Sequence, residues 1–136
     1  MATQDNDMYT GVWYCWHWYP SKNDTGEDVT KNRMRAHRQG NDLVLQSEPN
    51  DEQSYMFVRL SLYDGLATGS WHETTSPTGD FAGAMYSGAG QLIISDDNQS
   101  MEGKWAGVGF DHTTGERRMY TGRWALARKD DAYGRA

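Results

Sequence analysis

Short segments of alternating polar and apolar residues run through most of this sequence, and helical periodicity is almost absent. Clusters such as SKNDTGED, QGND, YDG and SPTGD separate the segments, and their residues favour turns because they tolerate positive φ angles or hydrogen-bond to their own backbone. The pattern therefore predicts an all-β chain with eight strands. These are Tyr9–Tyr19, Val29–Arg38, Leu43–Glu48, Tyr55–Tyr63, Leu66–Thr74, Phe81–Ser95 (with a break near Ser87-Gly88 left open), Met101–Phe110 and Met119–Arg128.

A Gly-x-Trp motif recurs along these segments and accounts for most of the tryptophans. Because side chains alternate in a strand, the glycine and the tryptophan face the same way, and the glycine leaves room for a ring to lie across a neighbouring strand. Closing about eight such strands into a barrel removes the sheet edges and leaves space for side chains or one small ligand. We expect a single antiparallel up-and-down β-barrel, with an open sandwich as the alternative. The copies are Gly11-Val12-Trp13, Gly69-Ser70-Trp71, Gly103-Lys104-Trp105 and Gly122-Arg123-Trp124.

Length and charge limit the class of protein further. A chain of 136 residues forms one domain, which we place at 9–128, with flexible polar ends at 1–8 and 129–136. The net charge of −6 argues against binding to duplex nucleic acid. The single cysteine, Cys15, can form no internal disulfide, and the N-terminus has no secretory signal. No apolar run approaches the ~20 residues that a membrane span requires, so we expect a cytoplasmic protein with no membrane association.

Several of these motifs resemble known barrel families. The Gly-x-Trp strand starts and the succession of hairpins resemble the calycin-like barrels, the lipocalins and avidins. The run FAGAMYSGAGQLIIS, followed by MEGKWAGVGF and YTGRWALAR, resembles the ligand-receiving barrels of actinobacterial helix-turn-helix regulators. It is more distantly similar to the cyclic-oligonucleotide receptor barrels of bacterial CBASS antiphage effectors. The resemblance implies a bacterial sensing barrel, although the partner segment that those proteins carry is not seen in this chain.

The first strand is aromatic on both faces. If Trp13 points inward, alternation places Cys15, His17 and Tyr19 on the same face. The outward set is Tyr14, Trp16 and Trp18, together with Val12. A loop, a terminal segment or a second subunit is expected to cover this outer face, and we favour a homodimer contact. A stacking platform for a planar ligand is the alternative.

The segment KNRMRAHR is the only basic concentration in the chain. Lys31, Arg33, Arg35 and His37 alternate with a second face that carries Met34 and Ala36, so the basic face is expected to meet water. If Arg33 and Arg35 faced the lumen or a dimer seam instead, their guanidinium groups would suit an anionic ligand.

Catalytic signals are few. The sequence has no nucleophile elbow, P-loop or paired-cysteine metal site, and its histidines are scattered, so we expect no metal and no cofactor. Glu73 shares the face of Trp71, and His17 on the first strand could lie opposite, which makes these two the candidates for proton transfer. Solvation of Glu73 at the barrel mouth is the simpler interpretation. Cys15 is expected to be a small buried hydrophobe rather than a nucleophile.

The sequence therefore predicts a small-molecule-binding barrel that acts as a soluble sensor or sequestering module. A planar, partly anionic ligand such as a cyclic oligonucleotide would suit its aromatic and basic residues. An enzyme that uses the lumen as a reaction chamber and a homo-oligomeric structural protein with a filled core are the alternatives, and the chain is not assigned as an enzyme. The candidate ligand-binding residues are Trp13, His17, Tyr19, Arg33, Arg35, Trp71, Glu73, Tyr86 and Trp105.

Overall fold

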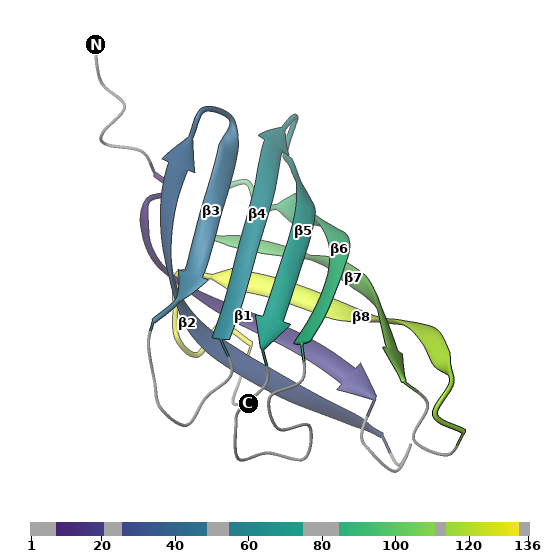
Figure 1. Cartoon of the computed structure of the whole chain (residues 1–136). Helices are drawn as coiled ribbons and strands as arrows, with labels where there is room; N and C mark the ends of the chain where they lie inside the picture. Colours follow the sequence, from purple (N-terminus) through teal and green to yellow (C-terminus); the bar gives the residue numbers. More distant parts are fainter. Residues whose placement is uncertain (1–7, 21–25, 49–54, 75–84, 111–113, 134–136) are drawn as a thin grey trace.

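The described residues form eight antiparallel strands that close into one barrel (Figure 1). Each strand pairs with the next in the chain, and β8 closes the barrel on β1. The computed structural model describes residues 8–20, 26–48, 55–74, 85–110 and 114–133. The predicted all-β fold and the up-and-down barrel are confirmed. The strands are β1 Gly11–Pro20, β2 Glu27–Gln39, β3 Asp42–Ser47, β4 Tyr55–Tyr63, β5 Leu66–Thr74, β6 Met85–Ile94, β7 Ser100–Phe110 and β8 Arg117–Ala127.

The strand predictions agree closely with these bounds. The sixth strand runs without a break through Ser87 and Gly88, and the expected strand residues 81–84 lie outside the described residues. The turn between β4 and β5 shows why the YDG cluster reverses the chain. Asp64 and Gly65 both have positive φ, at 55° and 76°, which is the backbone geometry of the tight turn that matches the twist of a hairpin. The described part of the chain contains no helix that could cross a membrane.

Alternation decides what lies inside the barrel. On β2, Asn32, Met34 and Ala36 are buried, whereas Arg33 and Arg35 are exposed.

The two ends of the lumen are distinguished here by the direction of the strands. We call the end where β1, β3, β5 and β7 finish the lower end, as drawn in Figure 1. The opposite end holds an apolar group that includes Trp13, Leu60, Leu92, Met101 and Leu126.

The glycines explain how so many indole rings fit in a narrow barrel. The ring of Trp71 on β5 lies across β6 and β7, where Gly88 and Gly107 leave room for it. A Cβ atom at Gly88 would come within 2.6 Å of this ring, and one at Gly107 within 2.7 Å. Trp105 lies over Gly122 in the same way, so the predicted use of the repeat holds at this one motif glycine. The nearest neighbours of Gly103 are backbone atoms of Gln91 and Leu92, and that of Gly11 is the Arg128 guanidinium. Gly69 differs, because its Cβ would lie 1.8 Å from the backbone oxygen of Arg59. That glycine therefore allows two strands to approach each other rather than a ring to cross.

The aromatic outer face of β1 is covered in part by the chain itself. Trp16 is fully buried, and the ring of Tyr133 packs edge-on against it with 5.1 Å between the ring centroids. Lys31 lies 5.8 Å from the Trp16 ring and pairs with Asp130, which fastens the same segment. Of the three residues proposed for a dimer contact, Tyr14 and Trp18 remain partly accessible. The segments expected to be flexible, 1–8 and 129–136, fall partly outside the described residues.

Candidate functional site

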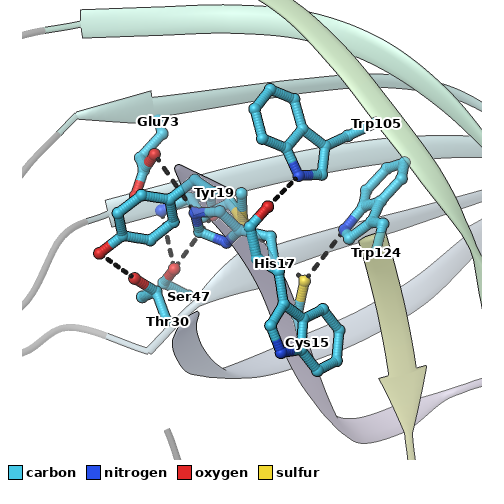
Figure 2. A network of polar contacts seen from close by, with 10 residues as sticks. Cys15, His17, Tyr19, Thr30, Ser47, Glu73, Trp105 and Trp124 are labelled. Atoms are coloured by element: carbon cyan, nitrogen blue, oxygen red, sulfur yellow. Dashed lines mark hydrogen bonds and ion pairs between the residues drawn. The ribbon is translucent and has the colours of Figure 1, made fainter. Parts of the chain in front are cut away.

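His17 and Glu73 face each other across the lower half of the lumen. His17 comes from β1 and Glu73 from β5, and Nε2 lies 3.7 Å from Oε1 (Figure 2). Their side chains are 10% and 13% exposed, so the pair is shielded from bulk water. At this distance the two side chains make no direct hydrogen bond, and they form an ion pair only when the imidazole is protonated. The sequence-based expectation that these two candidates could face each other agrees with this placement.

Burial governs the charge of His17. Removal from water lowers the pKa of the imidazole below its usual value, and the neighbouring Glu73 only partly opposes this effect. The ring is therefore neutral near pH 7. Its Nδ1 atom is buried and has no hydrogen-bond partner among the described residues. A neutral imidazole can donate from one ring nitrogen and accept at the other, so His17 offers the lumen a versatile polar group.

Trp71 and Trp105 form an aromatic wall beside this pair. Their rings meet edge to face, with 5.6 Å between centroids and an interplanar angle of 87°. The Trp105 Nε1–H group donates to the backbone oxygen of Trp18 at 2.9 Å (Figure 2), which fixes that ring. The Nε1 atom of Trp71 is buried and has no acceptor among the described residues. Trp71 therefore presents an unused hydrogen-bond donor within the same half of the barrel.

Tyrosines complete the lower part of the lumen. The Tyr19 ring lies 5.6 Å from the His17 ring, and its hydroxyl accepts a hydrogen bond from Thr30 at 3.3 Å (Figure 2). Tyr86 of β6 is paired in register with Glu73. Burial raises the pKa of Tyr86, and the charge of Glu73 adds to the rise, so this phenol stays protonated at neutral pH.

Cys15 lies deeper than His17 on the same face of β1. Burial raises the pKa of its thiol to about 12, even though the Trp124 Nε1–H group donates to Sγ at 3.3 Å (Figure 2). The sulfur also contacts Met56 Sδ at 4.0 Å. A thiol with so high a pKa is not a nucleophile at neutral pH, and its surroundings are those of a buried core residue, as expected.

Three candidate residues lie apart from this cluster. Trp13 is buried toward the opposite end of the lumen, where its Nε1–H group donates to the backbone oxygen of Tyr9 at 2.8 Å and Arg128 covers its ring. Arg33 and Arg35 lie on the outer face of β2, where both pair with Glu48. The expectation that the basic face meets water thus agrees with the structure, and the alternative that placed these two arginines in the lumen does not.

The structure brings together six of the nine candidates and adds two polar residues that sequence reasoning missed. The six are His17, Tyr19, Trp71, Glu73, Tyr86 and Trp105. Asn32 is 2% exposed on the inward face of β2, and Ser47 accepts a hydrogen bond from the Met56 backbone amide at 2.7 Å. The alternation of β2 already placed Asn32 on the face of Met34, so its burial could have been predicted. No comparable pattern marked Ser47.

Within the described ranges, no group of three histidine, cysteine, aspartate or glutamate side chains is arranged to hold a metal ion. The sequence matches no protein-family model, and no curated protein matches it.

Proposed function

We propose that this chain is a ligand-binding β-barrel that takes a small planar molecule into the lower half of its lumen and serves as a sensor or sequestering module. One observation carries the proposal. The Nδ1 atom of His17 and the Nε1 atom of Trp71 are both buried there without a hydrogen-bond partner among the described residues. Buried polar atoms in folded proteins are nearly always satisfied, and leaving one unsatisfied costs about 1–3 kcal/mol. A ligand with polar atoms at its edge would satisfy both.

The surrounding side chains support a planar ligand. Tyr19 packs beside His17, and Trp71 and Trp105 pack against each other in the lumen. Aromatic rings pack against flat molecules with a large gain in buried apolar area. Arg33 and Arg35 lie outside the lumen, so they lend no support to an anionic ligand within it. The proposed ligand is therefore planar, and no described residue of the lumen calls for a negative charge on it.

A thermal-melt screen against planar heteroaromatic compounds, mononucleotides and cyclic dinucleotides tests this function. A ligand at a hundred times its dissociation constant stabilises the folded state by ~2.7 kcal/mol, which raises the melting temperature by several degrees. Trp71→Phe keeps a ring but removes the Nε1–H donor, so we expect it to weaken binding of any compound that responds. Trp18→Phe, on the outer face, is the matched control. A flat response to the whole panel would overturn the proposal.

A barrel enzyme is the second candidate, and the 3.7 Å approach of His17 to Glu73 is the observation that favours it. A neutral imidazole beside a carboxylate can accept a proton from a bound substrate, and the carboxylate then stabilises the imidazolium. Glu73→Gln separates the two functions. An enzyme would lose turnover of a bound compound while still binding it, whereas a pure binding protein would show no turnover in either form.

A further inference from the structure

Glu73 is a nearly buried carboxylate that has no lysine or arginine partner in the part of the chain that the structure describes. Its one ion-pair contact there is with His17, whose imidazole is neutral near pH 7. The other carboxylates that pair with arginine or lysine do so on the outer face, as Asp42 does with Arg59. Arg118, near the start of β8, belongs to the alternating set of residues that points inward. Its side chain is exposed, however, and its guanidinium lies over the Tyr120 ring.

A carboxylate that is shielded from water and has no neighbouring cation is energetically unfavourable. Transfer of a charged group out of water is costly unless an opposite charge or several hydrogen bonds compensate for it. The side chain of Glu73 is 13% exposed, so water reaches only a small part of it. A positive charge placed in the lumen beside Glu73 would therefore be attracted more strongly than at the protein surface.

Aromatic residues neighbour Glu73 along and across the sheet. Trp71 precedes Glu73 by two residues on the same face of β5, and Tyr86 is directly opposite on β6. Tyr19 packs beside His17, the residue that Glu73 contacts. The faces of tryptophan and tyrosine rings attract cations through their quadrupoles, and this attraction grows when water is excluded.

We propose that the lumen selects a small organic cation, an ammonium or a positively charged nitrogen heterocycle, with its charge at Glu73 and its flat body against Trp71. This rests on the proposed ligand-binding function and adds the charge of the ligand to it. An inorganic cation fits less well, because hard cations need several oxygen ligands and the described residues offer one carboxylate at this point. A planar body uses the rings, and a hydrogen-bond acceptor on that body would reach the Nε1–H group of Trp71.

Calorimetric titration with three planar compounds of different charge tests the inference on the unmodified protein. The probes are 1-methylquinolinium, the uncharged quinoline and the anion 1-naphthoate, all at pH 7.5. We expect 1-methylquinolinium to bind about tenfold tighter than quinoline or more, which corresponds to ~1.4 kcal/mol, and 1-naphthoate to bind most weakly. Because this comparison uses the native chain, it does not depend on whether a variant folds.

Glu73→Gln then tests the residue. It should bring the affinity for 1-methylquinolinium down to that for quinoline while leaving the quinoline affinity unchanged. Glu27→Gln removes the same charge from an exposed position on the outer face of β2 and should preserve the preference. Equal binding of quinoline and 1-methylquinolinium, or a preference that survives in Glu73→Gln, would overturn the inference and leave the ligand-binding function standing. Failure of all three probes to bind, together with a flat thermal-melt screen, would overturn both.

Discussion

The indole ring of Trp71 on β5 lies against Gly107 on β7, two strands away, so closely that a Cβ atom at position 107 would be 2.7 Å from Cζ2. Real Cβ contacts do not occur at this distance, so either the ring or the strand must move if the glycine is replaced. The ring faces the site as well as the core. The packing of Trp71 over glycine therefore links the stability of the barrel to the shape of the proposed ligand site.

Gly107→Ala should lower the free energy of unfolding by about 1–3 kcal/mol, the usual cost of overfilling a packed core. In a Trp71→Leu background the contact with the ring is removed and the 3.0 Å approach to the Ser87 backbone oxygen remains, so the same substitution should cost less. Urea denaturation of the two single variants and the double variant measures this coupling. Gly109→Ala is the control on the same strand, because among the described residues its Cβ would meet only the Tyr120 ring, at 3.1 Å. Additive penalties for Gly107→Ala and Trp71→Leu would contradict the assigned packing.

The position of Trp71 along the barrel axis is a feature that the sequence could not predict. Alternation assigned the faces of β1 and β2, including those of Asn32, Met34 and Ala36, because a period of two is a local property. It could not assign the level of a residue along the barrel, since level depends on the stagger between strands. Trp13 and Trp71 both belong to Gly-x-Trp motifs and both point inward. Trp13 nevertheless packs beneath Arg128, whereas Trp71 lies toward the end of the lumen that contains Glu73.

The outer face of β1 shows a second limit. Trp16 looked like an exposed ring in need of a partner, and the sequence favoured another subunit as the cover. The cover found within the chain, Tyr133, lies in a polar C-terminal stretch that has no strand pattern. Contacts between a terminal segment and a sheet face leave no periodic signal, so only the structure could reveal this one. A homodimer through Tyr14 and Trp18 stays a prediction.

Removal of the Tyr133 ring should uncover Trp16. The ring packs against both Trp16 and Trp18, at 5.1 and 6.3 Å between centroids. Tyr133→Ala should therefore lower the free energy of unfolding by about 1–2 kcal/mol and shift tryptophan fluorescence to longer wavelength. Tyr133→Phe, which keeps the ring and loses the hydroxyl contacts with Glu102 and Ser100, is the control and should retain the buried Trp16 of the native chain. Size-exclusion mass of the alanine variant would also show whether the uncovered face self-associates.

Stability should fall in mild acid because of His17. Its pKa is lowered in the folded state by burial, so the unfolded chain binds the proton more readily. The contribution is fully present above the unfolded value of about 6.5 and is lost as pH decreases below it, with a slope that approaches ~1.4 kcal/mol per pH unit. Comparison of urea denaturation at pH 7.5 and pH 5 for the native chain and His17→Gln isolates the effect. His72→Gln, at an exposed position, is the control and should retain the pH dependence of the native chain. If the free energy of unfolding of His17→Gln changed with pH as that of the native chain does, the buried neutral imidazole would be contradicted.

Cys15 should be unreactive in the folded protein. Its thiol is fully buried and its pKa is raised to about 12 by burial, so the folded state holds almost no thiolate at pH 8. An aromatic disulfide reagent at pH 8 should therefore label the native chain only through unfolding, and the rate should rise with denaturant until it reaches that of the unfolded chain. The same shift makes stability decrease as pH rises above about 9, because only the unfolded chain then releases the thiol proton. Cys15→Ala should lose this contribution to the decrease in stability at alkaline pH. Rapid labelling of the native thiol at pH 8 would contradict the prediction and show that solvent enters the lumen as far as Trp124.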